Sequence, residues 1–130
     1  MPIRTFWDND KKNLIRIVFD THWDIAEFEK MIDEIREMRM GILYPVDIIL
    51  DFSTSYSGYN LNLLSIMGRI ERIVSNHTGI TLLLKPPPYI KYLVGVVERM
   101  APRITRDLYI VDSTEEAQEL LEKRQRPSES

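Results

Sequence analysis

The stretch that decides the fold is VDIILDFSTSYSG, residues 46–58. Its first half is an apolar run that ends at Asp51, and its second half is a loop of small and polar residues. A long segment with apolar residues at helical spacing begins near Asn60. This pattern predicts a buried central strand, a loop at its carboxyl end and the N-terminus of a helix. In open α/β sheets, ligands and partners dock at that edge, and helix N-termini there favour anions.

Strand and helix patterns alternate on both sides of this stretch. Two β-rich runs, residues 3–7 and 14–19, are joined by a polar loop and predict a hairpin. Asp24 and Glu27 have capping-box spacing at the start of a predicted helix that Gly41 ends. Four further elements follow: a helix from near Asn60 to Gly79, a strand over 80–84, a helix from the prolines at 86–88 to near Met100, and a strand over 108–111. A last helix is capped by Asp112 or Ser113.

The resulting order is ββαβαβαβα. It predicts an α/β fold with a mixed, mostly parallel sheet of about five strands and four helices, joined by right-handed crossovers. A length of 130 residues fits one domain with one modest core. We expect residues 1–125 to form this single domain and residues 126–130 to form a flexible C-terminal tail.

Charge and composition exclude some functions. Apolar residues make up 44% and charged residues 28% of the chain, as in ordinary globular proteins. The net charge of −3 argues against general nucleic-acid binding. Residues 66–111 nevertheless contain seven Lys or Arg against three acids. Solvated helix faces explain this excess, and the alternative is a basic rim for an anionic ligand or acidic partner.

The location and chemistry of the chain are also constrained. There is no cysteine, which excludes disulfides, thiolate nucleophiles and cysteine-ligated metals. The N-terminus lacks the apolar core of a signal peptide, and no apolar run approaches the ~20 residues that span a bilayer. We therefore expect a cytoplasmic protein without an integral membrane segment.

Nothing in the sequence has the pattern of an active site. The two histidines, His22 and His77, have no motif partner. A nucleophile elbow, a phosphate loop and metal-ligand spacing are all missing. We expect no enzyme activity, no catalytic residue, no metal and no cofactor.

Three features, together with the element order, resemble the STAS family, the fold of bacterial anti-sigma factor antagonists. The strand end ILDFS, residues 49–53, is similar to the family's strand that ends in Asp-Leu-Ser. Ser57 and Gly58 precede a long helix, and the ending IVDSTEEA, residues 110–117, is similar to the family's last strand and helix. The resemblance covers residues 14–121, and it concerns fold more directly than activity.

The resemblance implies a phosphorylation site. In regulatory members of the family, a partner kinase phosphorylates a serine just before that glycine, and the matching residue is Ser57. A phosphate there places about −2 charge at a helix N-terminus and on a docking surface. The chain departs from the family pattern, because it reads SYSGY at residues 55–59 where the family reads Asp-Ser-Ser-Gly-Leu, and its loop is shorter. The alternative is that these serines are turn and cap residues.

The leading hypothesis is a non-enzymatic module for bacterial regulation or stress signalling. It predicts a protein partner, an anti-sigma-factor-like kinase or another regulator, docked on the 53–60 loop and the following helix. The residues assigned to this surface are Ser53, Ser55, Tyr56, Ser57, Gly58, Tyr59, Asn60 and Arg69.

The alternative is a carrier of a small apolar molecule or lipid, as in lipid-binding relatives within the wider STAS-like group. It predicts an apolar pocket of at least ~300 Å³ at the same edge. Its candidate lining aromatics are Tyr56, Tyr59, Tyr89 and Tyr92. Self-association as a homodimer through the hairpin or its edge strand remains open.

Overall fold

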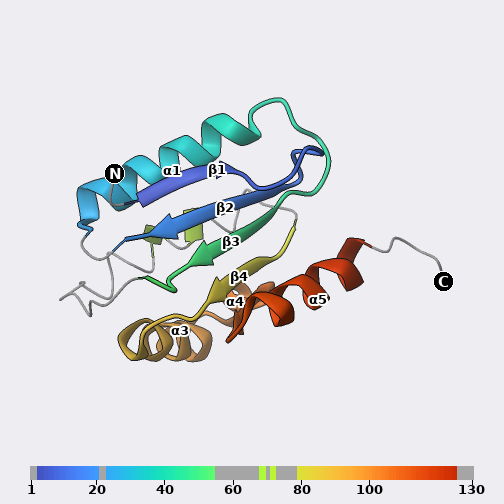
Figure 1. Cartoon of the computed structure of the whole chain (residues 1–130). Helices are drawn as coiled ribbons and strands as arrows, with labels where there is room; N and C mark the ends of the chain where they lie inside the picture. Colours follow the sequence, from blue (N-terminus) through green and yellow to red (C-terminus); the bar gives the residue numbers. More distant parts are fainter. Residues whose placement is uncertain (1–2, 21–22, 55–67, 70, 73–78, 126–130) are drawn as a thin grey trace.

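A computed structural model describes residues 3–20, 23–54, 68–69, 71–72 and 79–125 (Figure 1). The elements follow in the order β1 (Ile3–Trp7), β2 (Leu14–Phe19), α1 (Ile25–Arg39), β3 (Asp47–Asp51), β4 (Thr81–Leu84), α3 (Pro88–Met100), α4 (Pro102–Thr105), β5 (Leu108–Val111) and α5 (Thr114–Gln125). The predicted α/β class and the mixed, mostly parallel sheet of five strands are confirmed.

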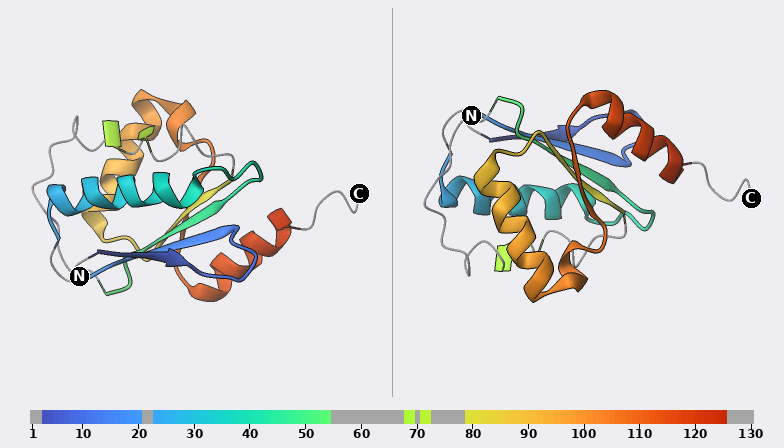
Figure 2. Two further views of the ribbon diagram at one scale, coloured as in Figure 1. Left: turned by 90° about the horizontal axis from the view of Figure 1, so that it is seen from above. Right: turned by 90° about the horizontal axis from the view of Figure 1, so that it is seen from below.

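The five strands lie in the sheet in the same order as in the sequence, β1-β2-β3-β4-β5. The hairpin strands β1 and β2 are antiparallel, and every later pair is parallel. Helices α1 and α3 pack in one core cluster on one face of the sheet, and α5 packs in a second cluster on the other (Figures 1 and 2). When successive parallel strands are neighbours in the sheet, right-handed crossovers place all the connecting helices on the same face. Helix α5 follows the last strand and connects no pair of strands, so it is free to pack on the other face.

The middle strand β3 is buried along its whole length. Ile48 and Leu50 belong to the cluster that contains α1, and Ile49 belongs to the cluster that contains α5. Asp47 interrupts the apolar run of this strand, and its side chain is buried nonetheless. Its Oδ1 accepts a hydrogen bond of 2.8 Å from the Ile80 N–H, so the carboxylate replaces solvent at the first N–H before β4.

Local signals at the helix ends are confirmed. Asp24 and Glu27 form both bonds of a capping box, and α1 ends just before Gly41, whose φ is 81°. Trp23 and Phe28 are buried with ring centroids 5.7 Å apart, as a hydrophobic staple requires. At α5, Ser113 rather than Asp112 provides the cap, since its Oγ accepts a hydrogen bond from the Glu116 N–H.

Two helix predictions need comment. The helix predicted from the prolines at 86–88 to near Met100 is confirmed as α3, which ends two residues before Pro102. The proline also begins a further short helix, α4, because its fixed φ suits the first helical position. Of the helix predicted from Asn60, the structure describes only the helical residues 68–69 and 71–72. The predicted tail, residues 126–130, lies outside the described residues.

Gly79 provides a test of this packing. A Cβ at residue 79 would meet the Val46 carbonyl oxygen at 2.5 Å and the Asp47 carboxylate, whereas a Cβ at Gly95 in α3 would meet nothing within 4 Å. We expect Gly79→Ala to lower the free energy of unfolding by about 1–3 kcal/mol through overpacking. Gly95→Ala should raise it by about 0.5–1 kcal/mol, because alanine favours the helix. Urea unfolding of both variants measures this difference, and equal effects would contradict the described packing.

Candidate functional site

The carboxyl ends of β2, β3, β4 and β5 lie along one edge of the sheet, because these four strands are parallel. Hydrogen bonds continue past the strand ends. The Phe52 N–H donates to the Leu84 carbonyl and the Lys85 N–H donates to the Val111 carbonyl, each at 2.9 Å. The segments that leave β3 and β4 therefore start from fixed positions at this carboxyl edge.

Asp51, the last residue of β3, is buried and has a donor for each carboxylate oxygen. Its Oδ2 accepts from the Arg16 guanidinium at 3.0 Å. Its Oδ1 accepts from the Ser53 N–H at 2.9 Å and from the Ser53 hydroxyl at 2.6 Å. The carboxylate thus joins β2, β3 and the beginning of the loop, and its bonds are structural.

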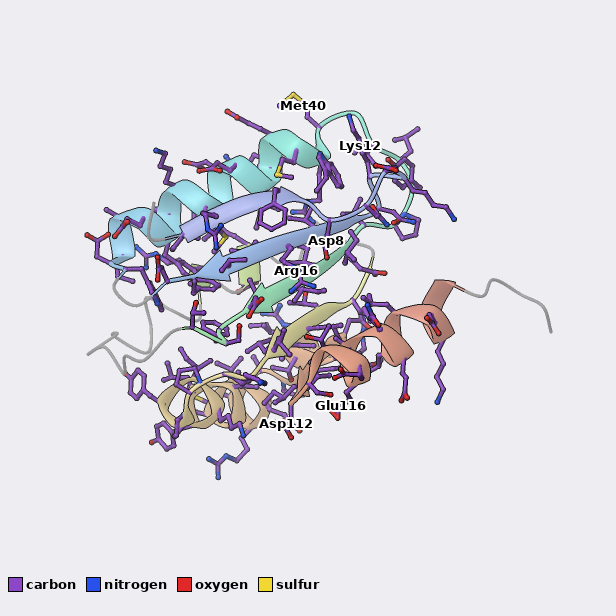
Figure 3. The ribbon with its side chains drawn as sticks, in the orientation of Figure 1. Asp8, Lys12, Arg16, Met40, Asp112 and Glu116 are labelled. Atoms are coloured by element: carbon purple, nitrogen blue, oxygen red, sulfur yellow. The ribbon has the colours of Figure 1, made fainter. Side chains whose placement is uncertain are left out.

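Arg16 connects this carboxylate to a second one. Its Nε donates to Asp8 Oδ2 at 3.0 Å, and Figure 3 labels these two residues. Asp8, Arg16 and Asp51 thus form a chain of opposite charges across β2. All three lie on the face of the sheet opposite α1, since Arg16 alternates with Ile15 and Ile17 of the α1 cluster. Most of the Arg16 side chain is covered, which makes this pair stronger than an ordinary surface ion pair.

Phe52 and Thr54, on either side of Ser53, are also held in place. The Phe52 ring is buried and stacks on Phe19 with centroids 4.4 Å apart. The Thr54 hydroxyl donates to the Phe19 carbonyl oxygen at 3.0 Å. The loop therefore leaves the sheet from a base that is fixed to both β2 and β3.

The structure places two of the predicted site residues and gives them different partners. Ser53 bonds to Asp51, whereas Arg69 pairs with Glu29 of α1, with Nε and Oε1 2.9 Å apart. Neither of these two partners is shared by Ser53 and Arg69. The other predicted residues lie outside the described part of the chain: Ser55, Tyr56, Ser57, Gly58, Tyr59 and Asn60.

Glu29 also binds Arg72, and it connects α1 to residues 69 and 72. Arg72 Nη2 lies 2.7 and 2.8 Å from the two oxygens of Glu29. This hydrogen bond, with the nearby charge of Arg69, lowers the pKa of the Glu29 carboxyl from its usual 4.5. On the other side, Glu71 pairs with Arg103 of α4 at 3.3 Å. These ion pairs connect the helical residues 68–69 and 71–72 to α1 and α4, and Figure 2 draws them between these two helices.

The aromatic candidates separate into two classes. Tyr89 is half-buried and packs against the core cluster that contains α1, so it is a packing residue. Tyr92, one turn further along α3, is 63% exposed. Tyr56 and Tyr59 lie outside the described residues.

A surface depression of about 650 Å³ lies away from the carboxyl edge. It is bounded by α3, α4 and β5, and its lining includes Val94, Glu98, Arg103, Leu108 and Ile110. The carrier hypothesis predicted an apolar pocket at the carboxyl edge. This depression is at the side of the sheet, and charged residues form part of its wall.

Sequence reasoning missed the Asp8–Arg16–Asp51 chain and this depression. A signal for the chain was present, because Arg16 interrupts an otherwise apolar strand. A charged residue in a covered strand requires a partner, and Ile49, which pairs with Arg16, has an aspartate two residues away on either side, Asp47 and Asp51. No pattern in the sequence predicts the depression, because its lining comes from three separate elements.

Metal-binding groups, membrane-spanning helices and similarity to known proteins were each sought in this chain, and none identifies it. Within the described residues, no group of three or more His, Asp or Glu side chains is arranged to hold a metal ion. His22 and His77 are outside those residues. None of the described helices is long and apolar enough to cross a membrane. No protein-family model matches the chain, and no curated protein matches it.

The charge chain can be tested by removing its cation. Arg16→Met keeps the aliphatic stem but leaves the buried Asp51 without its charged donor, so we expect a loss of about 1–3 kcal/mol in the free energy of unfolding. Arg36→Met is the control, because Arg36 and Asp33 form an exposed pair at 3.6 Å. It should cost less than about 0.5 kcal/mol. Urea unfolding that gives equal losses would refute a structural role for the chain.

The lowered pKa of Glu29 predicts a pH dependence of stability. A lowered folded-state pKa stabilises the fold above the usual carboxyl pKa, and this contribution disappears as the pH falls through the folded value. Glu29→Gln should therefore reduce the thermal midpoint at pH 7, with the difference from wild type vanishing in acid. Glu37→Gln, in the same helix but in none of the ion pairs between described residues, should show no such trend. A difference for Glu29→Gln that grows in acid would reverse the assigned sign.

Proposed function

We propose that the chain is a non-enzymatic, STAS-like protein-interaction module that docks a protein partner at the carboxyl edge of its sheet. The docking surface consists of the 53–60 loop and the helix that follows it. The observation that carries the proposal is the fixed base of this loop, where Asp51, Phe52, Ser53 and Thr54 are all bonded or buried. A loop that starts from a rigid base loses less conformational entropy on binding.

The polar groups at this edge are better suited to binding a partner than to catalysis. Both oxygens of Asp51 are occupied by structural donors, and Ser53 donates its hydroxyl proton to that carboxylate. A nucleophilic serine instead needs a base that is itself oriented by a third group. Within the described residues, the pair has no histidine or lysine partner.

The exposed residues at the same edge suit a protein partner. Tyr92 combines an exposed apolar ring with a polar tip, as interface aromatics do. Lys91 and Asp112 add charges beside it, with their charged atoms 4.0 Å apart. Lys85 has a φ of 51°, a left-handed conformation that costs roughly 1–2 kcal/mol in a residue with a Cβ. Such backbone strain gathers at functional sites.

Regulation by phosphate at Ser57 is part of the proposal, and Ser53 is a poor alternative. A phosphate on Ser53 would remove the 2.6 Å hydrogen bond to Asp51 and place about −2 charge beside a buried carboxylate. The carrier alternative has less support, because the described depression lies beside β5 rather than at the carboxyl edge.

A site-specific photocrosslinking experiment tests the docking surface. A photoreactive residue replaces Tyr92 at the carboxyl edge or, as the control, Leu43, which is 98% exposed in the loop before β3. After irradiation in the native cell, we expect one discrete crosslinked protein with the probe at residue 92 and none with the probe at residue 43. Crosslinks only from residue 43 would place the partner elsewhere and refute the proposed surface.

Mass spectrometry of the protein isolated from the same cells tests the regulation. We expect a phosphate on Ser57 and none on Ser53. Phosphorylation of Ser53 in the folded protein would contradict the structural role of its hydroxyl group. An unmodified protein that carries a bound small molecule would favour the carrier.

A further inference from the structure

The outer surface of α3 and α4 concentrates positive charge. Residues 85–107 contain five Lys or Arg and two acids, a charge of +3, in a chain whose net charge is −3. The other residues therefore carry a charge of −6. The five cations are all exposed: Lys85, Lys91, Arg99, Arg103 and Arg106. A positive surface on an otherwise acidic protein selects a partner of opposite charge.

Most of this charge is not neutralised within the described part of the chain. Lys85 and Arg99 are in none of the ion pairs between described residues. The other three cations have acidic neighbours, with 3.3–4.0 Å between the charged atoms. Each of these pairs is exposed to solvent on both sides, so it holds its cation weakly. The cations are therefore available to a partner.

The exposed face of α3 has an apolar component as well. Tyr92 is 63% exposed and Met100, at the end of the helix, is 59% exposed. Tyr92, Val96 and Arg99 have i, i+4, i+7 spacing and share one face of the helix. In the right-hand view of Figure 2, α3 and α4 lie toward the viewer, and none of the described elements covers them. This face combines an aromatic ring with an unpaired cation, as binding surfaces do.

The depression of about 650 Å³ continues this surface beside α4. Its lining combines apolar residues with two cations and one acid: Val94, Leu108, Ile110, Arg103, Arg106 and Glu98. An apolar side chain flanked by carboxylates is complementary to such a lining. The depression thus has the same preference as α3, an apolar group next to negative charge.

We propose that the partner presents an acidic, partly apolar segment that lies along α3 and α4. The inference rests on the proposed function, because this segment would extend the same contact from Tyr92 at the carboxyl edge to the depression. A lipid bilayer suits the surface less well, since a layer of headgroups does not fill a depression. Nucleic acid is repelled by the acidic remainder of the chain.

A second photoreactive position tests the path of the segment. A photoreactive residue in place of Met100, at the far end of α3, should crosslink the same protein in the native cell as the probe at residue 92. Mass spectrometry of the crosslinked peptides should place both attachments in a segment rich in Asp and Glu. A partner that crosslinks only from residue 92, or through a segment without acidic residues, would overturn the inference and leave the proposed docking surface in place.

Charge reversal tests the role of the cations. With the probe at residue 92, Arg99→Glu should lower the crosslinking yield about fivefold or more, because it sets a like charge against the acidic segment. Arg36→Glu is the matched control, since both arginines are exposed in the last turn of their helices. The control should keep the yield of the wild type. Circular dichroism checks that both variants are folded, and equal yields from the two would overturn the inference.

Sedimentation with vesicles tests the lipid alternative. Wild-type protein mixed with vesicles of equal parts phosphatidylcholine and phosphatidylserine should stay in the supernatant. Binding to these vesicles that Arg99→Glu removes would assign the surface to lipid and overturn the inference. The absence of any crosslink from residue 92 in the wild type would refute the proposed function, and the inference would fail with it.

Discussion

Two buried carboxylates at the ends of β3 constrain the rest of this structure. Asp47 and Asp51 are both removed from water, and each must find donors within the protein. Asp47 takes the Ile80 N–H at the start of β4, and Asp51 takes Arg16 of β2 together with Ser53. The middle strand is therefore joined to its neighbours by side chains as well as by the backbone ladder. The position of Ser53, just beyond the end of β3, follows from these bonds.

The parts of the fold that follow from local chemistry could be predicted from the sequence. The capping box at Asp24, the turn at Gly41 and the strand periodicities each depend on a few adjacent residues. The Arg16–Asp51 bond joins residues 35 positions apart, and it exists only once β2 and β3 are in register. The Asp47–Ile80 bond depends on strand pairing in the same way, because 33 positions separate the two residues. At the candidate site, the position of Ser53 was predicted, but its role as a donor to Asp51 was not.

The sequential order of the strands also affects how the chain acquires its structure. Each strand pairs with the strand that precedes it in the sequence, so no strand has to wait for a later one to be inserted between two others. Contacts between successive elements keep loop-closure costs low and favour fast folding. During synthesis, the N-terminal hairpin and α1 can form first, and each new strand then extends an existing edge. On this view β5 joins the growing sheet last and remains at its edge.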